Sequence, residues 1–176
     1  MARPSIAHQL LLASTIAFLG VWLWVAVTAP DRVPHHFNLA GEVDRWGSKW
    51  SLLAAIGAIA LILAAGFASA LWWVGRIPPG PLNIPNKEYW VAPEHRAEFN
   101  RRFAADLALL GSFTVLLLAS VLIASAHAAR AGGDAPAGWL QVPTVAFVVA
   151  TLTAVVWMAA FRYRVPDRDQ AGARSR

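Results

Sequence analysis

Two adjacent histidines and three carboxylates lie in one short polar segment near the start of the chain. His35 and His36 follow Asp31 and precede Glu42 and Asp44. Imidazole and carboxylate groups are ligands for Zn²⁺ or Cu²⁺, and His36 could also titrate as a pH sensor. However, adjacent histidines do not share one face of a helix or strand. The spacing therefore favours hydrogen-bonded loop histidines over a metal site, and we expect no cofactor.

A second group of ionisable residues lies within an apolar run. Asp106 and His127 are separated by about 30 Å if this run is helical, so they cannot form one catalytic pair. An intramembrane acid is a candidate for function, and a small ion-coupled transporter using both residues is one hypothesis. The position of Arg102 one helical turn earlier favours a simpler interpretation, in which Arg102 and Asp106 form an interfacial ion pair.

The remaining patterns do not predict an enzyme. The chain has no glycine-rich phosphate loop, no nucleophile elbow and no two-histidine helical zinc motif. Its lack of cysteine excludes disulfides, thiolate metal sites and a cysteine nucleophile. The sequence from Asn38 to Gly41 predicts a turn, because Asn tolerates the left-handed region and Gly adopts positive φ readily.

Composition places the chain in a membrane. Of its 176 residues, 57% are hydrophobic and 14% are charged, with a mean hydropathy of +0.49. Soluble domains average about 45–50% apolar and about 25% charged residues. The net charge of +5 then reflects which loops face the cytoplasm, and we expect no nucleic-acid partner.

The hydropathy pattern predicts an all-α integral membrane protein with four transmembrane helices. Each of four apolar runs is long enough to cross a bilayer, which takes about 20 residues. Residues 1–163 would form a single four-helix domain and residues 164–176 a polar, disordered cytoplasmic tail, with spans at about 7–28, 50–75, 103–129 and 140–161. The second run is rich in small residues such as Ala54, Ala58 and Gly66, which predicts that it is the packing centre.

Lysine and arginine predict the orientation. Eleven of the fifteen lie at the N-terminus, between residues 76 and 102, or after residue 161. Because cytoplasmic loops carry the excess of these residues, both termini should be cytoplasmic. A structured extracytoplasmic loop would then join helices 1 and 2. The prolines between residues 78 and 85 exclude regular helix there, and Pro93 is suited to the first position of the third long helix.

The polar segment from Pro30 to Lys49 resembles the signature of a bacterial membrane family of unknown function. That signature has Pro, then Ile/Val-Pro, then His-Phe/Trp-Asn, then Gly, then Asp, an aromatic residue and Gly-Ser-Lys. The same domain forms the N-terminal part of SdpI-type immunity proteins. The motif positions are His36, Asn38, Gly41, Asp44, Trp46, Gly47 and Lys49. A second loop resembles a segment of the family's small members, with Pro85, Asn86, Tyr89 and Trp90.

The resemblance implies a receptor-like protein of the bacterial inner membrane, because SdpI-type proteins protect cells against a secreted toxic peptide and sequester a repressor. The chain also differs from full SdpI-type proteins, because it has about four spans and they continue into a further C-terminal membrane segment. We therefore expect a non-enzymatic protein in the lipid bilayer, whose external loop 30–49 recognises a peptide, lipid or envelope partner. The alternative is an accessory or assembly subunit packed laterally in a larger membrane protein complex.

Overall fold

A computed structural model describes residues 5–38, 41–133 and 138–166 of the chain. Four of its helices are long and apolar enough to cross a membrane: Ile6–Thr28, Lys49–Ala68, Pro93–Arg130 and Gly138–Arg162. The predicted all-α fold is confirmed only in its coarser form, because the chain is mostly helical but also contains a two-stranded sheet. The predicted tail at residues 164–176 lies almost entirely outside the described residues.

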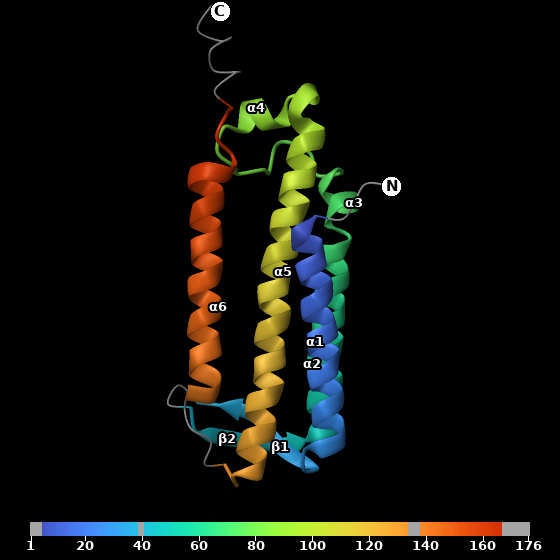
Figure 1. The fold of residues 1–176 in the computed structure, drawn as a ribbon, viewed down its shortest axis with the longest axis vertical. Helices are drawn as coiled ribbons and strands as arrows, with labels where there is room; N and C mark the ends of the chain where they lie inside the picture. The colour runs from blue at the N-terminus through green and yellow to red at the C-terminus, as the bar shows by residue number, and fades with distance from the viewer. Residues whose placement is uncertain (1–4, 39–40, 134–137, 167–176) are drawn as a thin grey trace, which may run out of the picture.

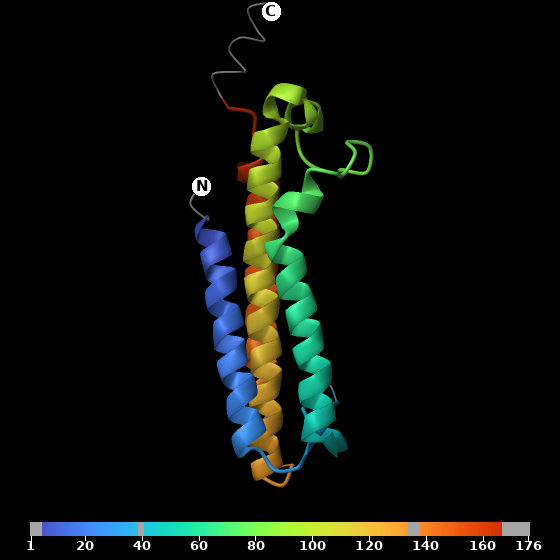
Figure 2. The same cartoon turned by 90° about the vertical axis from the view of Figure 1, so that its right-hand side faces the viewer.

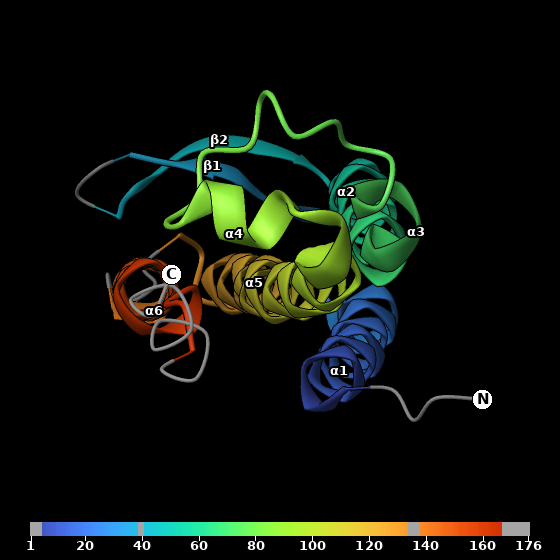
Figure 3. The same ribbon diagram turned by 90° about the horizontal axis from the view of Figure 1, so that it is seen from above.

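Helix α5 (Pro93–Arg130) is the central column of the molecule. It runs the full height of the bundle, with α1 (Ile6–Thr28) and α2 (Lys49–Ala68) on one side and α6 (Gly138–Trp157) on the other (Figures 1 and 3). Its long buried face is made largely of alanine, glycine and serine, which allows neighbouring helices to approach closely. Elements α1, α2, α3, α4, α6 and β1 all pack on it.

The prediction that the second span is the packing centre was wrong. Ala54, Ala58 and Gly66 are exposed on α2. The small residues that serve close packing lie mainly on α5, where Ala108, Gly111 and Ala119 are buried. The sequence pattern indicated helices that can pack closely, but small residues that face lipid give the same pattern.

The bundle core lies between α1, α2 and α5, which Figure 2 shows side by side. Phe18, Leu53 and Val115 are almost completely buried in it, one from each helix. One polar contact crosses this core: the Trp22 indole donates a hydrogen bond to the Leu53 carbonyl at 2.9 Å. In lipid such a bond is retained because a free indole N–H would have no water to bind.

The predicted span at 50–75 is divided in the structure. Helix α2 ends at Ala68, and a short helix α3 (Ala70–Val74) follows after Ser69. The Trp73 indole donates to the Gly66 carbonyl at 2.9 Å, which pairs one of the carbonyls freed at the break. Arg96 of α5 similarly donates to the carbonyls of Val74 and Ile77.

The segment between α1 and α2 forms a β-hairpin of β1 (Arg32–Phe37) and β2 (Val43–Ser48). The strands are antiparallel, and the pairing shifts register between Pro34 and His36 and again before Phe37. Val33 and Pro34 are buried, and β1 packs against α5 near the end of that helix (Figure 1). We call this end of the bundle the hairpin end.

The opposite end carries a loop and the short helix α4 (Lys87–Val91), and we call it the α4 end (Figure 1). Asn86 precedes α4 in the left-handed conformation, with φ of 54°. Pro93 occupies the first turn of α5, as its position in the sequence predicted. A π-helical turn, η1 (Met158–Arg162), continues α6 to this same end.

We predict that Gly111→Ala destabilises the bundle by about 1–3 kcal/mol, the usual cost of overpacking a core. A Cβ atom at Gly111 would overlap the Phe67 ring of α2. The matched control is Gly66→Ala, because no atom lies within 4 Å of a Cβ placed there. Thermal loss of helical circular dichroism in detergent measures both. Equal effects of the two substitutions would contradict close packing of α2 on α5.

Candidate functional site

The hairpin carries most of the motif residues, and its centre is a pair between the two strands. His36 Nδ1 on β1 lies 2.7 Å from Asp44 Oδ1 on β2. About half of each side chain is exposed, so water screens the pair and it contributes at most about 1 kcal/mol. The contact fixes the direction of the imidazole ring and leaves the other ring nitrogen free to face a partner.

His35 points to a different set of atoms, as expected for adjacent residues on a strand. Its Nε2 lies 3.0 Å from the Ser48 carbonyl, and its ring lies directly over Gly47. A Cβ atom at Gly47 would overlap the imidazole ring. Glycine at position 47 therefore allows the His35 ring to pack closely against the backbone. Its missing Cβ, rather than a turn conformation, is the reason that glycine fits here.

The hairpin turn is closed by Asn38. The Asn38 side chain accepts a hydrogen bond from Glu42 N at 2.9 Å and donates to the Glu42 carboxylate at 2.8 Å. Gly41 has φ of 86°, in the region that glycine adopts readily. These contacts give Asn38 and Gly41 structural roles. Leu39 and Ala40, which complete the predicted turn, lie outside the described residues.

Lys49 joins the hairpin to the bundle. Although it is charged, Lys49 is buried, and its ammonium donates to the Ala29 carbonyl at 2.9 Å. It also lies 3.4 Å from Asp31 Oδ1. Ala29 caps the C-terminal end of α1, where a cation is favourable for the helix dipole. This motif residue therefore holds the start of α2 to the end of α1 and is not available to a partner.

The accessible surface of the hairpin is mainly charged. Trp46 is half-buried and pairs with Pro34 in the strand register. The exposed side chains on the two strands are Arg32, His36, Asp44, Arg45 and Ser48. Within the described residues, no three His, Asp or Glu side chains form a group that could hold a metal ion. The hairpin thus presents a shaped polar surface of mixed charge.

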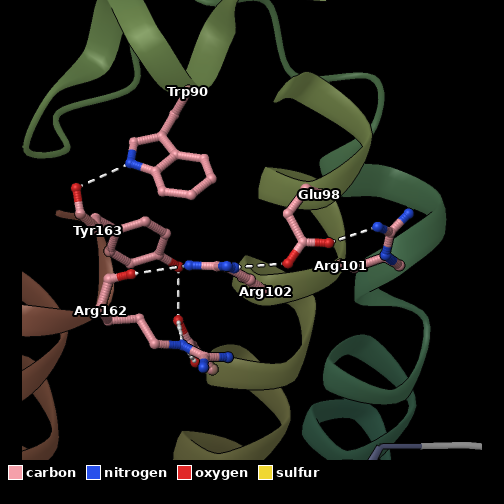
Figure 4. Close-up of polar contacts among 7 residues, drawn as sticks. Trp90, Glu98, Arg101, Arg102, Arg162 and Tyr163 are labelled. Carbon is pink, nitrogen blue, oxygen red and sulfur yellow. Dashed lines mark hydrogen bonds and ion pairs between the residues drawn. The ribbon is translucent and has the colours of Figure 1, made fainter. Parts of the chain in front are cut away.

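A second polar cluster lies at the α4 end, where α6 meets α5 (Figure 4). Asp106 of α5 is buried, and it accepts hydrogen bonds from Tyr163 Oη at 2.6 Å and Arg162 Nε at 3.0 Å. Burial raises the pKa of the Tyr163 hydroxyl above its usual value, and the hydrogen bond to Asp106 raises it further. With its pKa raised, the Tyr163 hydroxyl keeps its proton at neutral pH and donates a hydrogen bond to Asp106.

The second-loop motif binds the backbone of this cluster. The Trp90 indole and the Asn86 amide each donate to the Tyr163 carbonyl at 2.9 Å, and Figure 4 shows the Trp90 bond. Tyr89 stacks on His95 with ring centroids 3.9 Å apart. Pro85 directly precedes the left-handed Asn86. Asn86 and Trp90, grouped in sequence as a second-loop motif, thus secure the chain after α6.

The predicted pair between Arg102 and Asp106 was wrong. Arg102 Nε instead donates to Glu98 Oε1 at 2.7 Å, and Arg101 binds the other oxygen of the same carboxylate. Arg102 lies four residues from Glu98 and four from Asp106, so either carboxylate could pair with it on one helix. Asp106 pairs instead with Arg162, which the fold brings close to it. Two opposite charges near the same end of different spans were the sequence signal for this contact.

Asp106 and His127 lie near opposite ends of the apolar part of α5. His127 Nδ1 lies 2.9 Å from the Ile123 carbonyl, and its ring stacks on Trp139 of α6 at 4.1 Å. The hydroxyls of Ser112 and Thr114 bond carbonyls of their own helix, as expected for membrane helices.

Comparison with known proteins gives one match. Residues 13–61 match the model of a domain of unknown function, DUF1648. The matched stretch runs from α1 through the hairpin into α2 and contains every residue of the first motif. No curated protein and no solved structure matches the chain.

We predict that Asp106→Asn lowers the stability of the protein by about 1–3 kcal/mol, because the mostly buried Arg162 guanidinium would lose its charged partner. The control is Glu98→Gln, which changes a more exposed ion pair and should cost less than about 1 kcal/mol. Thermal unfolding in detergent compares the two variants. If Asp106→Asn is as stable as the native chain, the cluster does not hold α6.

Proposed function

We propose that this chain is a non-enzymatic, multi-pass membrane protein whose hairpin recognises an extracytoplasmic peptide. The observation that carries the proposal is the construction of the hairpin. Its turn is closed by Asn38 and Gly41, its strands are joined by His36 and Asp44, and its base is fastened by Lys49. A surface ordered before binding loses little entropy when a partner binds.

The exposed residues fit a polar, extended partner. Arg45, His36 and Asp44 place both charge signs within a short distance on the hairpin. An extended peptide can also add its backbone to the outer side of a two-stranded sheet, with neighbouring side chains supplying specificity. In this proposal Arg45 and the His36–Asp44 pair select the peptide, and Asn38, Gly41, Gly47 and Lys49 keep the hairpin in shape.

The orientation belongs to the same proposal. Helix α1 begins and η1 ends at the α4 end (Figure 1), which also carries Lys87, Arg96, Arg101 and Arg102. The excess of basic residues at this end supports a cytoplasmic position. The hairpin end would then face outward from a bacterial inner membrane, where a secreted peptide could reach it. The resemblance of the hairpin motif to that of SdpI-type immunity proteins supports this receptor-like role.

A second candidate function is supported by α6. Within α6, which the structure describes in full, no residue is buried, and the helix packs chiefly against α5. Most of its apolar surface is therefore available to helices of another protein, as an accessory subunit requires. Purification in mild detergent tests this: larger integral subunits recovered in stoichiometric amounts favour the accessory role, and a lone monomer or homodimer contradicts it.

We predict that Arg45→Cys reacts with a membrane-impermeant maleimide added to intact cells. The native chain contains no cysteine, so each labelled thiol is unique. The control is Glu94→Cys, an exposed position at the α4 end that should react only after the membrane is permeabilised. The opposite labelling pattern would contradict the proposed orientation and place the hairpin in the cytoplasm.

We also predict that a photo-reactive residue in place of Arg32, an exposed position on β1 outside the residues proposed to select the peptide, forms a discrete cross-link to a peptide or protein. The adduct should be lost when His36 and Asp44 are both changed to alanine, because the two strands then present a different surface. The same probe at Glu94 should not give this adduct. An adduct that persists in the double variant, or its absence from position 32, would contradict recognition by the hairpin.

A further inference from the structure

The two strands of the hairpin differ in what lies along their outer edges. Strand β1 packs against α5, so its outer edge is turned toward the bundle. Strand β2 pairs with β1 alone in the sheet and lies on the far side of β1 from α5 (Figure 3). The outer edge of a terminal strand presents unpaired backbone N–H and C=O groups. The edge that a further strand can join is therefore that of β2.

Strand pairing shows which backbone groups of β2 point to this edge. Just after the strand, Lys49 N donates to the Asp31 carbonyl at 2.9 Å. Inward-facing groups recur at every second residue of an antiparallel strand, so those of Gly47 also face β1. Trp46 pairs with Pro34, whose nitrogen carries no hydrogen. The N–H and carbonyl of Trp46 therefore point outward, where they can bind the backbone of an extended peptide.

The charged side chains of the hairpin are not all paired. Each of the three carboxylates in residues 31–49 has a partner, in the pairs Asp31–Lys49, His36–Asp44 and Asn38–Glu42. Arg32 and Arg45 are exposed and have no hydrogen-bond or ion-pair partner among the described residues. Arg45 lies on β2 beside the free edge, whereas Arg32 lies on β1, one strand away from it.

We propose that the peptide recognised by the hairpin joins the outer edge of β2 as a third strand and carries a carboxylate that pairs with Arg45. This inference rests on the proposed function and names the chemistry of its partner. Side chains directly opposite on neighbouring strands have Cβ atoms about 4.5–5.5 Å apart, which an arginine and a glutamate can bridge. A guanidinium can donate two parallel hydrogen bonds to a carboxylate.

The strand edge favours a peptide over a lipid headgroup as the partner. A lipid phosphate could also bind the guanidinium of Arg45, but it has no row of alternating donors and acceptors to match those of β2. An extended peptide supplies both the backbone groups for the edge and the carboxylate for Arg45. Arg32 then provides a matched control, because it is the same residue type, equally unpaired, and removed from the edge by one strand.

The experiment selects peptides on the purified full chain in phosphatidylcholine nanodiscs, with empty nanodiscs as background. The probe is a displayed library of randomised peptides of about ten residues, which is longer than a typical strand. We expect the retained peptides to be enriched in aspartate and glutamate. Arg45→Glu should reverse this preference toward lysine and arginine, and should weaken binding of a peptide selected on the native chain about tenfold. Arg32→Glu should change neither result, and thermal unfolding checks that both variants fold.

Addition of the peptide as a strand is tested with the same selected peptide. Methylation of backbone nitrogens at alternate residues removes the N–H groups from only one edge of an extended chain. We expect one of the two alternate sets to abolish binding, and the other set, which faces away from β2, to leave binding nearly unchanged. Equal effects of the two sets would overturn addition at the edge.

The selection also separates this inference from the proposed function. If no peptide is enriched over empty nanodiscs, both fail. Enrichment without a preference for acidic residues, or a preference that Arg45→Glu leaves unchanged, would overturn the pairing with Arg45 and leave peptide recognition standing. Equal effects of Arg32→Glu and Arg45→Glu would show general attraction of charge. Displacement of the peptide by phosphatidylglycerol vesicles, but not by phosphatidylcholine vesicles, would mean that Arg45 binds lipid phosphate instead.

Discussion

Close packing on the small-residue face of α5 is the contact on which the rest of the structure depends. Lipid chains are as apolar as leucine, so no hydrophobic force drives membrane helices together, and association relies on close contact and hydrogen bonds. Gly111 against Phe67 and the buried alanines of α5 supply that contact for α1 and α2. The hairpin then rests on the end of the same helix through β1.

Polar interactions at the two ends of α5 complete the fold. At the α4 end, Asp106 holds Arg162 and Tyr163, and thereby the end of α6. At the hairpin end, stacking of His127 on Trp139 holds the start of α6. Between these contacts α6 is held mainly by apolar side chains, and an apolar hollow lined by residues such as Leu116 and Ala146 remains between it and α5. The arrangement explains how a helix without buried residues keeps a defined position.

Much of the architecture could be predicted from sequence because membrane spans are long and free of charge. The four apolar runs indicated the four long helices, and Pro93 indicated where α5 begins. The centre of the bundle could not be predicted, because small residues at exposed positions of α2 and at buried positions of α5 give the same pattern. The partner of Asp106 depended on which helices are neighbours, and local spacing favoured Arg102 instead.

The position of the polar motif in the fold was predicted better than the contacts of its residues. The sequence placed the motif between the first two spans and predicted the turn at Asn38, but it grouped Lys49, and Asn38 as well, with residues for a partner. Their bonds to Ala29 and Glu42 show that they shape the hairpin, because buried cations and amides take whichever acceptors the fold brings near. Strand pairing was also missed, since Pro34 and the glycines reduce the usual strand signal.

The central claim is that the hairpin is ordered before any partner binds. Hydrogen exchange of the purified protein in lipid nanodiscs tests it most directly. We expect the amides of Asn38 and Lys49, which donate to the carbonyls of Glu42 and Asp31 at 2.9 Å, to be protected to a degree similar to amides near the ends of α1. Exchange of these hairpin amides at the rate of an unstructured peptide would contradict a preformed recognition surface.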